Sequence, residues 1–228
     1  MRRRRPMLQR LALLALAGML SACTLLPERE PDRLYLLPAT SLAPVDGPPL
    51  AVRLRVDTPQ ASALLSGARI LVMPAPNRLQ AYAGARWSDR IPLLLRDRLV
   101  EGLRDRGRLS AQDDNSPLGA DVALVSDLRA FQSVYQPGIE PGIEPGIEPG
   151  IEPGIEPGME PGLPVVEIRL DATLVDETQR QRLAERRFEA REPTTGTDVQ
   201  QVVEAFGRAA DTLAREVAEW SEGILERR

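Results

Sequence analysis

Apolar and polar residues alternate over several stretches of this 228-residue chain, as is typical of strands that bury one face. Leu50–Val56 is the clearest case, because every second residue in it is apolar. Three later stretches predict longer strands that follow one another as an antiparallel meander. The predicted strands are Leu34–Leu37, Leu50–Val56, Arg69–Met73, Leu79–Tyr82, Asp121–Val134, Leu163–Val175 and Arg182–Ala190.

A helical period replaces this alternation in two places, the first at about Asp89–Arg106. Ser88 can cap the start of this helix, Pro92 falls in its first turn, and Gly107 lies where a C-terminal cap is expected. Four leucines share one helical face and predict a buried side. These are Leu94, Leu95, Leu99 and Leu103.

The second helix follows Thr197–Gln200, which fits a capping box with Thr197 as the cap. Its apolar residues recur at spacings of three and four, so one face must be covered. The stripe consists of Val202, Phe206, Ala209, Leu213, Val217, Trp220 and Ile224. We expect Phe206 in the core of the same molecule and Trp220, near the chain end, at a contact. Two helices and a mostly antiparallel sheet predict an α+β fold in a single domain.

The N-terminal segment 1–22 has the layout of a signal peptide, with five arginines followed by a short apolar run. Leu20–Cys23 resembles a lipobox, which predicts cleavage between Ala22 and Cys23 and acylation of the Cys23 thiol. Two or three acyl chains anchor a protein to a bilayer without a spanning helix. Residues 23–32 then form a tether. Asp after the acylated cysteine is the usual signal by which a lipoprotein avoids sorting to the outer membrane, and this chain has Thr24 there. Thr24 therefore favours the periplasmic face of the outer membrane. The alternative interpretation of Cys23 is that it is an unmodified cysteine buried in the core.

Between two predicted strands, residues 137–162 carry five consecutive Pro-Gly-Ile-Glu units and two variants of them. Proline at every fourth position forbids a helix and a central strand. The segment is either a tandem expansion of a hairpin loop or a semi-rigid spacer. In both cases we expect it to be dispensable for the fold.

Composition limits the chemistry of the remaining chain. Five of the 29 basic residues belong to the signal segment, which leaves 24 against 33 acidic residues and a net charge of −9. This balance argues against nucleic-acid binding. The chain has no histidine and one cysteine, so the common catalytic triads and metal sites are excluded. We predict no catalytic residue, no metal site and no cofactor, and we interpret Asp113 and Asp114 as solvated turn residues.

Tyr82 and Trp87 are the aromatic residues that lie near the start of the first helix. An aromatic side chain at such a junction can anchor a partner, or it can complete the core. Together with Trp220 they are the candidate partner contacts.

In this order and spacing, the motifs resemble the family of ABC-type transport auxiliary lipoproteins, over roughly residues 20–225. The Pro-Gly repeats depart from the family pattern. The motifs are the lipobox Cys23, Tyr35–Pro38, Ile70–Val72, Leu79–Tyr82, Arg86–Ser88, Phe131, Arg182–Phe188, Ala205–Phe206 and Trp220.

The resemblance implies an auxiliary α+β domain at 33–225 that serves a transport system moving lipids or other hydrophobic compounds between two membranes. It further implies an ABC permease, an ATPase and a partner of the MCE (mammalian-cell-entry) type, as in the PqiC-like outer-membrane lipoproteins. A homo-oligomer is left open. The alternatives are a structural or assembly lipoprotein of the outer membrane and, less favoured because histidine is missing, a lipoprotein hydrolase.

Overall fold

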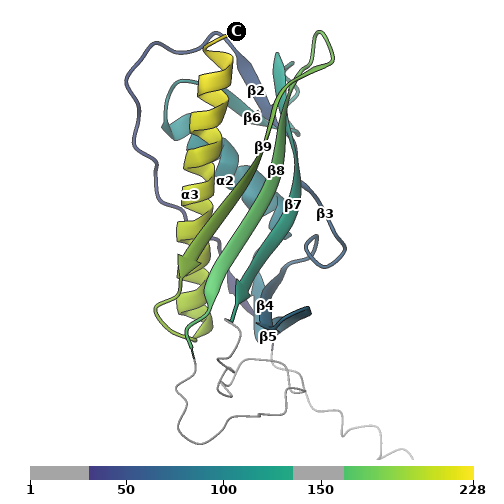
Figure 1. The fold of residues 1–228 in the computed structure, drawn as a ribbon, viewed down its shortest axis with the longest axis vertical. Helices are drawn as coiled ribbons and strands as arrows, with labels where there is room; N and C mark the ends of the chain where they lie inside the picture. Colours follow the sequence, from purple (N-terminus) through teal and green to yellow (C-terminus); the bar gives the residue numbers. More distant parts are fainter. Residues whose placement is uncertain (1–30, 136–161) are drawn as a thin grey trace, which may run out of the picture. The chain divides into compact units, whose positions relative to one another are not determined.

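The computed structural model describes residues 31–135 and 162–228. The unit Asp32–Arg228 is compact and carries two helices and nine strands among these residues. The strands are β1 Arg33–Tyr35, β2 Arg53–Val56, β3 Gln60–Ala61, β4 Arg69–Ala75, β5 Arg78–Trp87, β6 Ser110–Asp113, β7 Val122–Val134, β8 Val165–Asp176 and β9 Gln181–Pro193. The helices are α2 Ile91–Asp105 and α3 Val199–Leu225 (Figure 1).

The long strand β7 organises the sheet. Along one edge it pairs with β8 over its whole length, and β8 pairs in turn with β9, all antiparallel. Along its other edge β7 pairs successively with β2, β3 and β4, all parallel. β6 extends the sheet from β2, while β5 and β1 extend it from β4. The predicted meander and the α+β class are therefore confirmed, and the short strands make the sheet mixed.

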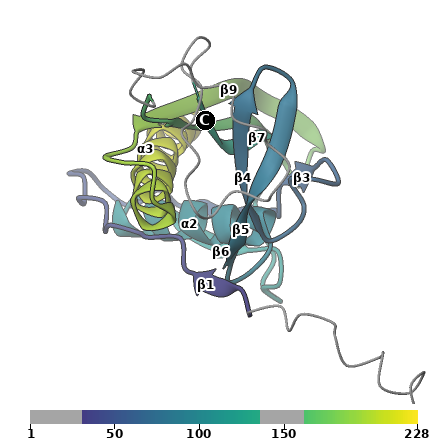
Figure 2. The same ribbon diagram turned by 90° about the horizontal axis from the view of Figure 1, so that it is seen from below.

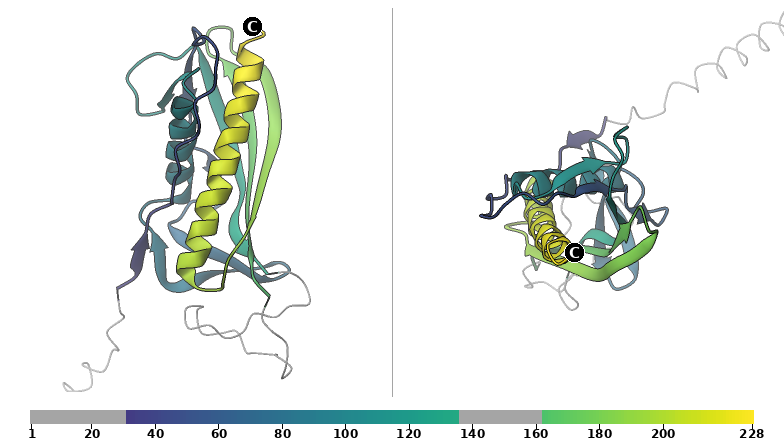
Figure 3. Two further views of the ribbon diagram at one scale, coloured as in Figure 1. Left: turned by 90° about the vertical axis from the view of Figure 1, so that its left-hand side faces the viewer. Right: turned by 90° about the horizontal axis from the view of Figure 1, so that it is seen from above.

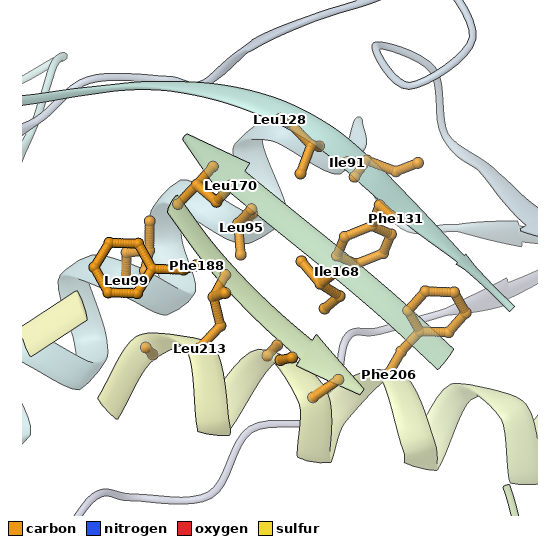
Figure 4. Close-up of a cluster of buried hydrophobic side chains, with 14 of the residues drawn as sticks. Ile91, Leu95, Leu99, Leu128, Phe131, Ile168, Leu170, Phe188, Phe206 and Leu213 are labelled. Atoms are coloured by element: carbon orange, nitrogen blue, oxygen red, sulfur yellow. The ribbon is translucent and has the colours of Figure 1, made fainter. Parts of the chain in front are cut away.

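The curved sheet and the two helices enclose one core, as views along the long axis of this unit show (Figures 2 and 3). α2, α3 and the inner faces of β7, β8 and β9 all contribute side chains to it (Figure 4). Burying a large apolar side chain completely stabilises a fold by about 1.5–3 kcal/mol. Phe131, Ile168, Phe188 and Phe206 are each at most 1% exposed, so each contributes at about this level.

In both helices the N-cap residue differs from the predicted one. Arg90 is the residue before α2, and its side chain makes no capping hydrogen bond. Ser88, the predicted cap, lies two residues earlier and donates its backbone N–H to the Tyr35 carbonyl oxygen, which joins β1 to this corner. The cap of α3 is Asp198, whose carboxylate accepts a hydrogen bond from the Gln200 N–H at 2.9 Å, so Thr197 is not the cap. Gly107 follows α2 with a φ of +79°, the left-handed conformation that a C-terminal glycine adopts.

Residues 36–52, which we call the strap, contain no helix or strand and run across both helices. The Thr40 N–H donates to Asp211 on α3, and the Leu42 N–H donates to Asp105 at the end of α2. Pro38 lies so close to Gly207 that a Cβ at position 207 would come within 2.7 Å of its ring. The strap therefore covers the outer side of the helix pair, and glycine at 207 makes this approach possible.

The strap is also held by a buried arginine. The Arg98 guanidinium, with its side chain 2% exposed, donates to the Asp211 carboxylate at 2.6 Å and to the Thr40 carbonyl oxygen at 2.6 Å. A buried charge is tolerated when it is paired and hydrogen-bonded, and removing one partner then costs several kcal/mol. This network joins α2, α3 and the strap at one point.

Candidate functional site

The structure divides the predicted site residues into three groups. Ala22 and Cys23, the predicted cleavage and acylation site, lie outside the described residues. Tyr82 and Trp87 are 4% and 0% exposed, so both belong to the core and offer no side-chain surface to a partner. Trp220 is partly exposed and is the aromatic candidate that remains open to contact.

Trp87 is the centre of an aromatic cluster beneath the start of α2. Its ring lies edge-on to Phe131, with centroids 5.9 Å apart, and to Phe206, with centroids 5.3 Å apart. Phe131 and Phe206 stack at 4.8 Å. Such contacts add about 0.5–1.5 kcal/mol each beyond the burial of the rings. The cluster fixes β5, β7 and α3 against one another, which is a structural role.

Tyr82 lies earlier on β5, where its hydroxyl contacts the Ser133 hydroxyl at 3.1 Å. Burial raises the pKa of the Tyr82 phenol above its ordinary value, so it stays neutral at physiological pH. The contact joins β5 to the end of β7.

Trp220 packs against Phe188 on the inner face of β9, with ring centroids 5.4 Å apart. The Arg186 guanidinium lies over the Phe188 ring at 4.9 Å. Trp220 thus marks the place where α3 meets β9, and part of its surface is accessible there.

The outer face of β7, β8 and β9 carries a network of ion pairs that we call the charged face. It consists of Arg129, Glu167, Arg169, Asp171, Arg187, Glu189 and Arg191. Asp171 on β8 accepts hydrogen bonds from Arg187 on β9 at 2.6 Å and from Arg129 on β7 at 2.9 Å. The bonds from Arg187, with a smaller contribution from Arg129, lower the pKa of Asp171 to about 2. Asp171 is therefore ionised at neutral pH and joins three strands.

A second row of charges crosses the same face closer to the start of β8. Glu167 pairs with Arg169 at 2.7 Å and with Arg191 at 2.8 Å, and Arg191 also pairs with Glu189 at 3.1 Å. The sequence signal was the number of charged residues along Arg182–Ala190, a stretch that the sequence analysis treated only as a strand and a family motif. The charged face is a functional candidate that the sequence analysis missed.

A groove of about 550 Å³ lies on the other side of the unit, between the strap and the outer face of α2. Arg96 in its lining is already paired, since it donates to Asp97 and Asp114, both at 2.7 Å. Burial alone would raise the pKa of Asp114, but hydrogen bonds from Thr58 and Arg96 outweigh it and keep the pKa below its ordinary value. Asp114 does lie in the predicted turn, but it is an ion-pair partner, while Asp113 ends β6.

Within residues 31–135 and 162–228, no three His, Cys, Asp or Glu side chains are grouped so that they could bind a metal ion. The helices of this described part are also too short or too polar to span a bilayer. What the site offers is two surfaces for binding, the groove and the charged face, with carboxylates held ionised by arginines.

Comparison with known proteins first defines a fold class. The crystal structure of protein XCC0632 from Xanthomonas campestris matches with a TM-score of 0.69 and 24% identity, over 86% of this chain and 97% of that chain. The crystal structure of an uncharacterized protein matches with a TM-score of 0.59 and 16% identity, over 83% and 98%. At these identities the likeness establishes a shared α+β fold.

The sequence comparison is more specific. Residues 35–140 match the family model described as the ABC-type transport auxiliary lipoprotein component. This region runs from the end of β1 through β7. No curated protein matches the sequence.

Proposed function

We propose that this chain is a membrane-anchored auxiliary lipoprotein of an ABC-type transport system and has no catalytic activity of its own. The observation that carries the proposal is the match of residues 35–140 to the auxiliary lipoprotein model. The α+β fold supports it, because its sheet and helices form one continuous domain around the matched region.

The anchor in this proposal is an acylated Cys23. Asp32, where the compact unit begins, is the ninth residue after Cys23, and a chain of nine residues reaches about 30 Å when extended. The domain would therefore work close to the bilayer that holds the acyl chains. Thr24 favours the outer membrane, with the domain in the periplasm.

A binding role agrees with the chemistry of the described surfaces. The carboxylates whose pKa values shift, Asp114, Asp121, Asp171 and Glu226, all shift downward because arginines or backbone N–H groups bind them. A general acid needs a pKa near the working pH, which these groups lack. Trp220, partly exposed beside β9, is the aromatic residue we assign to a partner contact.

The partners proposed are an ABC permease with its ATPase and an MCE-type substrate-binding protein, and the cargo is a lipid or another hydrophobic compound. The resemblance described above suggests both. In such a system the lipoprotein would supply a fixed docking point at one membrane, while ATP hydrolysis takes place at the other.

Affinity isolation of the intact lipoprotein from membranes of its native host tests this proposal. We expect mass spectrometry to identify an ABC permease or ATPase, and an MCE-type protein with them, at amounts comparable to the bait. Trp220→Ala should reduce their recovery. Arg78→Ala is the control, because Arg78 is exposed and lies on β5 rather than on α3, and this variant should leave the recovery unchanged. Recovery of structural envelope proteins alone would contradict the transport role.

A further inference from the structure

β9 forms an open edge of the sheet. Among the described residues it pairs with β8 on one side, and no strand pairs with its other side. The strand has 13 residues, so a row of backbone N–H and C=O groups is available for pairing along this edge. At the end of the strand, Arg208 on α3 donates to the Pro193 carbonyl oxygen at 2.8 Å.

Proteins commonly protect such edges with charges that repel a second strand. On β9 the outward-facing residues instead alternate in sign: Glu185, Arg187, Glu189 and Arg191. All four are exposed, and the side chains of Arg187 and Arg191 are 69% and 62% accessible. An alternating row is complementary to its own antiparallel copy.

The register of that pairing follows from the sequence. Residues directly opposite in an antiparallel pair face the same side of the sheet. With a two-fold axis at Phe188, Arg187 lies opposite Glu189 of the second copy, and Glu185 lies opposite Arg191. Symmetry doubles each contact, so four opposite-charge pairs form. Moving the axis by one residue, to Arg187 or Glu189, sets like charges opposite each other.

The pairs would also continue the charged face across the boundary. Within one molecule Arg169 lies beside Glu189 in the β8–β9 register, and Asp171 lies beside Arg187. In the register centred on Phe188 one row therefore reads Arg169 and Glu189, then Arg187 and Asp171 of the second copy. The signs alternate along these four residues, as they do between β8 and β9 within one molecule.

We propose that two copies of this chain associate through the β9 edge, antiparallel and with the two-fold axis at Phe188. A self-complementary patch is what a two-fold interface requires, and an added strand supplies main-chain hydrogen bonds as well as side-chain pairs. Trp220 lies under Phe188 on the inner side, so its accessible surface would be next to the seam. This association does not depend on the transport partner.

The test uses the acylated lipoprotein in detergent, with its oligomeric state measured by sedimentation over a range of concentrations. We expect a dimer, and we expect Arg187→Glu to weaken it by about tenfold or more, because two symmetry-related pairs become repulsive. Arg129→Glu is the matched control, since Arg129 also binds Asp171 but lies on β7, away from the edge. The exchange Arg187→Glu with Glu189→Arg should restore the dimer.

Disulfide formation tests the register. In the variant Glu185→Cys with Arg191→Cys, the two cysteines are about 20 Å apart along one strand and cannot pair within a molecule. Oxidation should give a covalent dimer, while Arg187→Cys with Arg191→Cys should give little. A monomeric wild-type protein, a dimer that is insensitive to Arg187→Glu, or equal crosslinking of the two cysteine pairs would overturn the proposal.

Discussion

Phe206→Ala tests the packing that holds the unit together. Phe206 has no exposed surface and lies between Phe131, which it stacks on at 4.8 Å, and Trp87, which meets it edge-on at 5.3 Å. Truncating a buried phenylalanine costs about 3–5 kcal/mol. Because two aromatic contacts are lost together with the ring, we expect the upper half of that range, about 4–5 kcal/mol.

The loss is large compared with the total stability of a domain, about 5–15 kcal/mol. It should lower the melting temperature by about 10–20 °C for a domain of this size. Urea unfolding followed by circular dichroism measures the loss of unfolding free energy. The slope of that free energy against urea concentration should stay unchanged if only the native state is affected. Tryptophan fluorescence should shift to the red, because Trp87 loses a buried neighbour.

Two variants make the result interpretable. Phe206→Leu keeps most of the apolar volume without the ring, and should cost about half as much. Ile224→Ala lies on the same helix at a half-buried position, and should cost less than either. A loss below about 1.5 kcal/mol for Phe206→Ala would refute the assignment of Phe206 to the core.

Three further predictions concern the anchor, the repeat and the charged face. Cys23→Ser should leave an unprocessed precursor that no longer partitions into the detergent phase, and normal processing of this variant would contradict the lipobox. Excision of 141–160 should shift the melting temperature by no more than a few degrees, since surface changes usually cost under about 0.5 kcal/mol, and unfolding would show that the segment packs. Hydrogen bonds lower the pKa of Asp171 from its ordinary 3.8 to about 2, so its contribution is present above pH 3.8 and is lost as the pH falls to 2. Asp171→Asn should therefore destabilise the fold by about 1 kcal/mol at pH 6, allowing for solvent screening, and by almost nothing at pH 2, whereas a constant difference in urea unfolding would count against this reasoning.

The elements that the sequence predicted well are those with a long hydrophobic period. β7, β8 and β9 each have at least 12 residues, and α3 has 27, so the pattern repeats often enough to define a face. β3 and β6 were missed because strands of two and four residues carry no period. They form because β2 and β7 offer them backbone partners, which is information about the fold as a whole.

The strap was missed for a related reason. Arg98 reads as a polar position of an amphipathic helix, yet it is buried because Asp211, 113 residues away, meets it. The assignment of Tyr82 and Trp87 was left open between core and contact, and only the packing of β5 against β7 and α3 shows that both are buried. Contacts between residues so distant in sequence have no local signal.

The transport role is tested most directly by measuring the accumulation of a hydrophobic fluorescent compound in living cells. Three strains are compared: one lacking this lipoprotein, one lacking the ATPase recovered with it, and one lacking both. A shared pathway predicts the same change in all three, and restoration of the first strain by the wild-type protein but not by Cys23→Ser. Additive changes in the double deletion, or full restoration by Cys23→Ser, would contradict an anchored auxiliary component of that transporter.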